Sequence, residues 1–291
     1  MEEISFTDQR YPELLRQIQC PPPTVFCLGV PPRSGEPAVA IVGTRKATFE
    51  GRIFAKRLAK ELSRAGLSIV SGLAIGIDGA AHEGALEGGG RTVAVLAGGL
   101  DKTYPRVHEG LAKKIIESGG GILSEYPPGT SPLQHQFLDR NRIIAGLALA
   151  TVIVEAPEHS GALATARYAV ESGREVMVVP GAAGHPNYAG SHMLLRTGAR
   201  LVASAGDVLE DIEGLLQTYG LEPLKTVQKD DGTSVEDALI MEALRAQGPL
   251  TIDKLAELVN LETHIVLERL TYLMLCGRVT ETQGRYALKH E

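Results

Sequence analysis

The sequence predicts an α/β protein: an extended Rossmann-like domain with a doubly wound, mainly parallel sheet, followed by a small C-terminal winged helix-turn-helix domain. Two observations predict the first domain. Apolar strand-like runs meet glycine near their ends, and amphipathic segments separate these runs, which lie at 38–46, 67–78, 92–101 and 175–181. Strands this apolar are covered by helices on both faces. The third observation is a change of pattern after residue 234, where short helical segments precede a hairpin.

Composition limits the class of protein. The 291 residues are 44% hydrophobic, enough for one large domain and a small one. The N-terminus is acidic and lacks an apolar signal segment, and the apolar stretch at 143–154 is too short for the ~20 residues of a membrane span. The three cysteines form no C-x-x-C pair. These features favour reduced thiols, a cytoplasmic location without membrane contact, and neither a metal site nor a cofactor.

The elements follow in order along the chain. Residues 1–37 are rich in proline and are expected to form an extended N-terminal arm packed on the main domain. Residues 38–213 form the Rossmann-like domain, whose first helix, 52–64, is expected to bury Ile53, Leu58 and Leu62. Residues 214–234 lose the apolar period and are expected to be a linker. Further strands are expected at 121–125, 150–155, 175–179 and 199–203.

The C-terminal module, residues 235–291, is expected to contain helices at 235–246, 252–260 and 262–276 and a hairpin that turns at 283–284. This order is typical of a winged helix, which usually reads DNA. The third helix carries Glu262 and Glu268 against Arg269, and the module has 6 Lys and Arg against 9 Asp and Glu. Because phosphate contacts need cations, a protein-contact or vestigial role is favoured over DNA binding.

A local cluster of phosphate-binding groups is expected where the first strand turns into its helix. The chain has a net charge of −6, and residues 38–213 carry 18 Lys and Arg against 18 Asp and Glu, so the average field attracts no polyanion. Gly43, Thr44, Arg45 and Lys46 can bring amides, a hydroxyl and two cations to one phosphate. The alternative is a solvated turn. The segment lacks the G-x-G-x-x-G pattern, so NAD is not expected.

Glycines after the next two strands extend this expected site. Gly72 and Gly98 follow apolar runs and allow the backbone to approach an anion closely. Asp78 and His82 lie four residues apart on the helix that follows Gly72, so they share one face. They either orient a ligand or, as we favour, are a helix-start carboxylate and a hydrogen-bonded histidine.

The segment that starts at Phe137 carries the strongest single pattern. Phe137 offers a stacking surface. Arg140, Asn141 and Arg142 supply cations and a base-edge hydrogen-bonding group within two helical turns, as single-strand binding requires. The alternative is a helix whose arginines pair with acidic residues such as Asp139.

A strand end and a helix start contribute the last expected groups. Glu155 ends a strand, and Ser160 and Gly161 begin a helix with a nest of amides. Glu155 is either a catalytic carboxylate or, as we favour, an acceptor for a bound base. No Ser-His-Asp order, nucleophile elbow or metal-ligand cluster argues for hydrolysis, so catalysis is not expected.

The strings GTRKAT, VSGLA, AVLAGGLD, LSEYPPGT, RNRIIAGL, SGALATA and VVPG follow one another in the order and spacing of the DNA-processing protein A (DprA, or Smf) family. The chain resembles this family over about residues 8–206. The resemblance implies an extended Rossmann-like domain that forms a homodimer, binds single-stranded DNA and loads a RecA-type recombinase in natural transformation. It also implies that Arg45 grips phosphate, that Phe137 stacks on a base, and that Asn141 and Arg142 help to form the pocket.

The chain departs from the family pattern at four positions. Gln134, which we keep among the expected DNA-binding residues, stands where a lysine is usual, and Leu138 stands in place of a proline. Ile75 occupies a usually basic position, and His192 an expected asparagine. Each lost cation predicts weaker phosphate contact, by about 1 kcal/mol.

The expected function is that of a non-catalytic, dimeric mediator that binds single-stranded DNA, protects incoming DNA and loads a recombinase during competence. Two alternatives remain open. One is a regulatory nucleotide-binding sensor whose winged helix contacts a protein. The other is an enzyme similar to nucleotide phosphoribohydrolases that uses Glu155 or Glu125, although the PGG-x-GT-x-x-E signature of those enzymes is absent.

Overall fold

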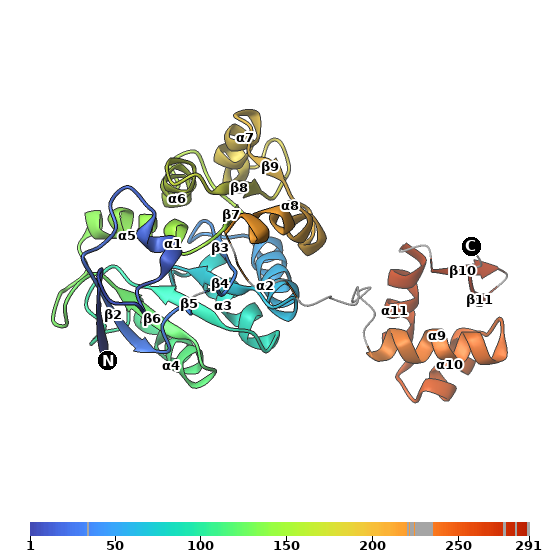
Figure 1. Ribbon diagram of the computed structural model, residues 1–291. Helices are drawn as coiled ribbons and strands as arrows, with labels where there is room; N and C mark the ends of the chain where they lie inside the picture. The colour runs from blue at the N-terminus through green and yellow to red at the C-terminus, as the bar shows by residue number, and fades with distance from the viewer. Residues whose placement is uncertain are drawn as a thin grey trace. The chain divides into compact units, whose positions relative to one another are not determined.

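The computed structural model describes residues 1–33, 35–219, 221, 224, 235–275, 278–282 and 284–289. The chain divides into two compact units, Met1–Thr226 and Val227–Glu291. The larger unit is an α/β domain, and the smaller one carries three helices and a two-stranded sheet (Figure 1). Among the helices of the described residues, none combines the length and the apolar character needed to cross a bilayer.

A nine-stranded sheet forms the centre of the larger unit, in the order β1-β2-β6-β5-β4-β3-β7-β8-β9 (Figure 1). The neighbours from β6 across to β9 all pair in parallel. These strands are β3 (Ala38–Val42), β4 (Ser68–Ser71), β5 (Thr92–Val95), β6 (Gly121–Ser124), β7 (Ala150–Ile153), β8 (Glu175–Val178) and β9 (Arg200–Leu201). These parallel pairs confirm the mainly parallel sheet expected from the apolar runs. Every residue of β3 to β7 is also buried, as expected of strands covered on both faces.

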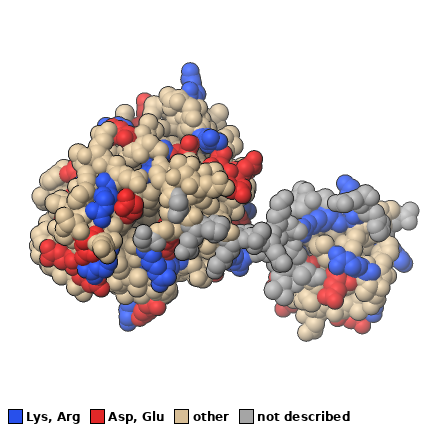
Figure 2. Space-filling view, in the orientation of Figure 1, with Lys and Arg blue, Asp and Glu red and all other residues tan. Residues whose placement is uncertain are grey.

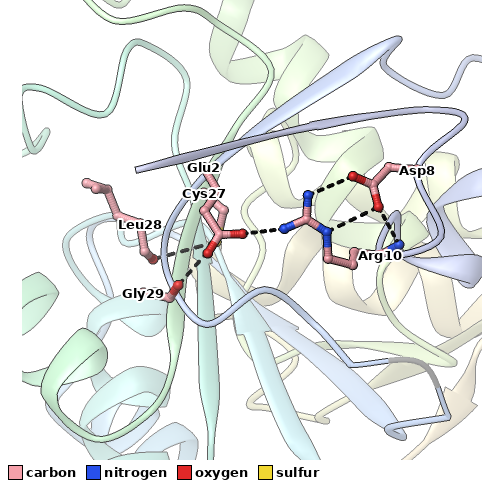
Figure 3. Close-up of polar contacts among 6 residues, drawn as sticks. All are labelled: Glu2, Asp8, Arg10, Cys27, Leu28 and Gly29. Carbon is pink, nitrogen blue, oxygen red and sulfur yellow. Dashed lines mark hydrogen bonds and ion pairs between the residues drawn. The ribbon is translucent and has the colours of Figure 1, made fainter.

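The N-terminal segment extends this sheet, whereas the sequence predicted only an extended arm. It forms β1 (Glu2–Ser5), α1 (Glu13–Arg16) and β2 (Thr24–Gly29), and β2 pairs antiparallel with both β1 and β6. The prolines lie between these short elements and therefore do not interrupt them. Arg10 bridges Glu2 at 2.8 Å and Asp8 at 2.7 Å on the surface of this segment (Figure 3).

Helices cover both faces of the sheet, as the doubly wound prediction requires. The apolar cluster that contains Ile41 and Ile69 includes residues of three helices of one face, α2 (Phe49–Arg64), α3 (Ile77–Glu87) and α8 (Ala205–Thr218). The cluster that contains Val42 and Val70 includes residues of α5 (Gln134–Gly146) and α6 (Gly161–Glu171), and α7 (Ala189–Arg196) packs against it. Helix α4 (Glu109–Glu117) covers β5 and β6. Short 3-10 helices precede α4 and α7, namely η1 (Arg106–His108) and η2 (Pro186–Tyr188).

Helix α2 corrects one detail of the sequence prediction. Leu58 and Leu62 are buried as expected, but Ile53 is 49% exposed. Five residues separate Ile53 from Leu58, which at about 100° per residue leaves them roughly 140° apart around the helix. Ile53 therefore lies outside the stripe that faces the sheet.

The predicted linker at 214–234 begins inside α8, which continues to Thr218; residues 225–234 lie outside the described residues. The smaller unit has the expected order of three helices and a hairpin. Its elements are α9 (Val235–Gln247), α10 (Ile252–Val259), α11 (Thr263–Leu275), β10 (Val279–Thr282) and β11 (Arg285–Leu288), with β10 and β11 antiparallel. The core of this unit includes Ile240, Leu255 and Leu270.

Candidate functional site

A pocket of about 1010 Å³ lies at the carboxyl ends of β3 and β7. The strand order reverses between these two neighbours, since β4 to β6 lie on one side of them and β8 and β9 on the other. Such a switch point opens a ligand crevice in doubly wound sheets. Most of the predicted site residues line it together: Gly43, Thr44, Arg45, Lys46, Gln134, Phe137, Arg140, Asn141, Ser160 and Gly161.

The turn after β3 supplies two exposed cations to the pocket. The backbone N–H of Thr44 donates to the carbonyl of Glu155 at 2.8 Å, and the N–H of Lys46 donates to the Thr44 hydroxyl at 3.2 Å. These bonds fix the turn, and the exposed side chains of Arg45 and Lys46 line the pocket. This arrangement favours the interpretation of the turn as an anion site over its interpretation as a solvated turn.

An aromatic ring stands beside these cations. The guanidinium carbon of Arg45 lies 5.1 Å from the centroid of the Phe137 ring, within the range of a cation–π contact. The ring of Tyr104 meets Phe137 edge to face, with 5.5 Å between centroids. Tyr104 is 50% exposed and was not predicted from the sequence, although an aromatic residue in the turn after β5 was a signal for it.

The floor of the pocket is a buried polar layer. Arg140 is 4% exposed and donates from Nη1 to the carbonyls of Gly72, at 2.9 Å, and Val95. Burial lowers the pKa of Arg140 to about 10, which leaves it charged at neutral pH. Burial also raises the pKa of Asp78, against the nearby charge of Arg140 and the bond from the Gly72 N–H.

Gly72 makes this layer possible without lining the pocket itself. A Cβ at Gly72 would lie 2.6 Å from Arg140 Nη2 and 2.7 Å from Asp78 Oδ2. Any side chain there would therefore displace the buried pair. Gly98 also lies away from the pocket lining, where its carbonyl accepts a hydrogen bond from Ser124 at 2.7 Å.

The N-terminus of α6 forms another wall of the pocket. Ser160 caps the helix, with its hydroxyl accepting from the N–H of Ala162 at 3.2 Å, and Gly161 carries no side chain to obstruct the approach of a ligand. Asn141 ties α5 to this wall, because its Nδ2 donates to the Gly161 carbonyl at 3.2 Å. Helix N-termini attract anions through their exposed amides and dipole.

Glu155 is buried away from the pocket and holds neighbouring segments together. It is fully buried, and its carboxylate accepts from the Thr48 N–H at 3.1 Å, from Thr48 Oγ1, from Asn187 at 2.8 Å and from Tyr188 at 3.2 Å. A carboxylate occupied in this way joins the start of α2 to η2. The structure therefore supports neither role considered from the sequence, that of a catalytic carboxylate or that of an acceptor for a bound base.

Arg142 also has a structural role. Its guanidinium forms a bidentate ion pair with Glu125, at 2.8 and 2.6 Å, and its Nε donates to the carbonyl of Cys20 at 3.0 Å. The side chain thereby fixes the N-terminal segment against α5 and β6 and is not among the residues that line the pocket. The alternative of a helix arginine paired with an acid holds here, and the acid is Glu125.

His82 is a core histidine, as favoured from the sequence. It is fully buried, and its Nδ1 lies 2.6 Å from the Thr92 hydroxyl. Because that hydroxyl donates to the Ile69 carbonyl, Nδ1 of His82 carries the hydrogen and donates. Burial lowers the pKa of His82 to about 3, reinforced by the charges of His108 and Arg140.

The positions that depart from the family pattern lie in different places. Gln134 is exposed and lines the pocket at the start of α5, and Ile75 is 51% exposed between the lining residues Ala74 and Asp78. The ring of His192 stacks on Tyr188 outside the pocket lining. The sequence prediction missed several further lining residues, namely Leu138, Thr165, Pro186 and Ala189.

The third helix of the smaller unit carries a paired arginine. Arg269 of α11 binds Asp237 of α9 through Nε at 2.8 Å and Nη2 at 2.6 Å, and Asp237 is fully buried. The guanidinium carbon also lies 5.1 Å from the Tyr272 ring. The guanidinium of Arg269 therefore stabilises its own unit.

The fold and the pocket define a class of protein: a doubly wound α/β domain that gathers cations, helix amides and an aromatic ring at its switch point. Acidic and basic side chains are interspersed over the visible face of the larger unit (Figure 2), and the pocket lining contains Arg45, Lys46 and Arg140 together with Asp78 and Glu158. A sequence profile of the DNA recombination-mediator protein A family matches residues 2–213, and the chain belongs to this family.

Individual relatives agree with this assignment. The chain is 43% identical over 251 residues to the putative DNA processing protein DprA of Mycobacterium tuberculosis, which covers 86% of this chain and 64% of that protein. It is 40% identical over 210 residues to DprA of Bacillus subtilis, covering 72% and 70% of the two chains. The chain thus spans just under two thirds of the length of the mycobacterial relative.

Two solved structures share the fold. The X-ray structure of DprA from Streptococcus pneumoniae superposes with a TM-score of 0.66 at 39% identity, covering 72% of this chain and 74% of that one. DprA from Helicobacter pylori, whose structure concerns its single-stranded DNA binding mode, superposes with a TM-score of 0.63 at 30% identity, covering 72% and 94%.

Proposed function

We propose that this protein is a recombination mediator that binds single-stranded DNA. In this proposal it acts as a cytoplasmic homodimer that protects incoming DNA and loads a RecA-type recombinase in natural transformation. The observation that carries the proposal is the switch-point pocket, which is lined by Arg45, Lys46, the Phe137 ring and the N-terminus of α6, with the Arg45 guanidinium over the ring. The single-stranded DNA binding of the Helicobacter pylori relative supports it.

The chemistry of the pocket favours an unpaired strand over a duplex. The cations and the α6 N-terminus suit a phosphate, and the half-buried Phe137 ring suits the face of a base. In a duplex both faces of each base are covered by its neighbours, so a recessed ring reaches only a base that has left the stack.

The hydrogen bonds of two carboxylates support a role without catalysis. The carboxylates considered for a phosphoribohydrolase-like reaction are Glu155, bound by Thr48, Asn187 and Tyr188, and Glu125, paired with Arg142. A general base needs a lone pair that reaches the substrate. Neither carboxylate lines the pocket, and both accept hydrogen bonds from neighbouring segments.

A regulatory nucleotide sensor is the second candidate function. The pocket volume of about 1010 Å³ matches the upper range of small-ligand sites, and uncharged Gln134 and Ile75 lie on and beside its rim. In either function the smaller unit contacts a protein rather than DNA, because Arg269 of α11 is paired with Asp237.

The test compares binding of the full chain to oligo-dT, to a duplex of equal length and to a nucleoside monophosphate. We expect oligo-dT to bind most tightly. Equal affinity for duplex and single strand would refute the proposal, and tighter binding of the mononucleotide would favour the sensor. Release of free base from the mononucleotide would establish an enzyme instead.

A further inference from the structure

An exposed apolar strip lies along the carboxyl edge of the sheet beside the pocket, and one of its residues, Leu138, also lines the pocket. We define it by Ile75 after β4, Tyr104 and Val107 after β5, and Leu133 and Leu138 at the start of α5. Their exposed fractions range from 48% for Leu138 to 72% for Val107. Large apolar side chains this exposed and this close to a pocket mark a contact surface for a ligand or partner.

Hydrogen bonds and ring contacts join the loops that carry the strip. His108, next to Val107, has its Nδ1 2.8 Å from the Leu73 carbonyl, so η1 packs on the loop that carries Ile75. Gly99 donates to the Thr130 carbonyl at 2.9 Å, which joins the loop after β5 to the one that leads to Leu133. The Tyr104 ring contacts Phe137, which lines the pocket. The strip is therefore continuous with the pocket.

The charges of the strip balance, unlike those of the turn after β3. Between β5 and the first residue of α4, Lys102 and Arg106 are matched by Asp101 and Glu109. The turn after β3 presents Arg45, whose guanidinium lies over the Phe137 ring, and Lys46, which lines the same pocket. A nucleic-acid strand laid across Phe137 thus meets the cations of this turn as well as the apolar rings and methyl groups of the strip.

We propose that Tyr104 is a second stacking platform, which takes the base next to the one on Phe137, and that the strip holds the unpaired bases beyond it. The occupant is the base side of single-stranded DNA, so this inference rests on the proposed function. The two rings meet at 63°, so bases stacked on them are splayed apart and the strand bends between them. The phosphates of this strand lie toward Arg45 and Lys46.

This division also explains the uncharged residues at Ile75 and Gln134. Binding that relies on stacking and apolar contact releases few counterions. With Arg45 and Lys46 as the exposed cations that line the pocket, the log-log dependence of affinity on salt has a slope of about −1.4, from roughly −0.7 per neutralised phosphate of a single strand.

The test uses the absence of tryptophan from the chain. The variant Tyr104→Trp introduces a single indole, whose fluorescence is quenched when a base stacks on it. We expect quenching with oligo-dT and none with an abasic oligonucleotide of equal length. The matched control is Phe49→Trp, on α2, since Phe49 is 65% exposed and does not line the pocket; it is expected to show no quenching.

Affinity gives the second readout. Tyr104→Ala is expected to weaken oligo-dT binding about 5- to 150-fold, the range for losing one stacked base, and to leave binding of the abasic strand unchanged. Tyr104→Phe keeps the ring and is expected to bind like the wild type. Because Tyr104 is half exposed, all variants are expected to melt within a few degrees of the wild type.

The outcomes separate the two proposals. A wild-type chain that does not bind oligo-dT would overturn both. Wild-type binding that survives Tyr104→Ala, or an unquenched Tyr104→Trp, would overturn the stacking role alone. If Tyr104→Ala instead abolished binding of a recombinase and left DNA binding intact, the strip would be a protein-contact surface.

Discussion

Replacing Arg45 with alanine is the most direct test of the pocket. Arg45 is exposed and its guanidinium contacts the Phe137 ring, so its loss removes a cation at little cost in stability. A charge-assisted hydrogen bond to phosphate contributes about 1–3 kcal/mol, which predicts a roughly 5- to 150-fold rise in Kd. The log-log salt slope is expected to become shallower by about 0.7, because one fewer phosphate is neutralised.

The slope is the decisive readout for this variant. Removing Arg45 also uncovers a face of Phe137, so stronger stacking could mask part of the loss in affinity, whereas stacking does not change counterion release. The assay is fluorescence anisotropy of labelled oligo-dT over salt concentrations from about 50 to 200 mM. The matched control is Arg52→Ala, since Arg52 lies on α2 outside the pocket lining and its guanidinium bonds the Ala47 carbonyl. If Arg45→Ala and Arg52→Ala give the same isotherms and slopes, the phosphate site lies elsewhere.

Three further predictions concern stability and the smaller unit. Arg142→Ala leaves the mostly buried Glu125 carboxylate, whose side chain is 14% exposed, without its ion-pair partner. The variant is expected to lose about 3 kcal/mol of stability, or roughly 6–12 °C in Tm, with DNA affinity unchanged below the transition. Calorimetry should show a smaller loss for Arg142→Ala combined with Glu125→Gln, and an equal loss would contradict the ion-pair account. The free energy of unfolding is expected to fall by about 2 kcal/mol between pH 6.5 and 5 through His82, because the unfolded chain takes up a proton below about 6.5 and the folded one only near 3. Denaturant melts at both pH values should show this loss in the wild type and not in His82→Asn. Deleting residues 232–291 is expected to leave oligo-dT affinity unchanged, because Arg269 is paired with Asp237; a large loss with an unaltered melt of the larger unit would show that the deleted unit touches DNA.

Several site residues could be predicted from the sequence because they follow strands. A buried parallel strand that ends in glycine places the next residues at one edge of the sheet, so Thr44 and Arg45 after β3 were expected there, and Ser160 and Gly161 after β7 as well. The same rule predicted Gly43 and Lys46. The order of the strands could not be predicted in this way, because hydrophobic pattern does not say which strands pair.

The structure was needed to assign roles to polar residues within these segments. Arg140, Asn141 and Arg142 are consecutive on α5, but successive residues point about 100° apart, so Arg140 reaches the floor of the pocket while Arg142 turns to Glu125. Whether a charge faces a ligand or a partner depends on groups distant in the chain. Glu155 meets Thr48 across 107 positions, and Arg142 meets the carbonyl of Cys20 across 122.

The sequence by itself determined the class of fold, the buried strands and the edge of the sheet where the pocket opens, because these depend on local periodicity and on glycine at strand ends. Only the tertiary structure decided that the N-terminal segment adds two strands to the sheet, that Glu155 and Arg142 hold the fold together, and that Tyr104 stands beside Phe137. The physical reason is that these contacts join segments whose approach is set by the packing of the whole domain, and no short stretch of sequence encodes that approach.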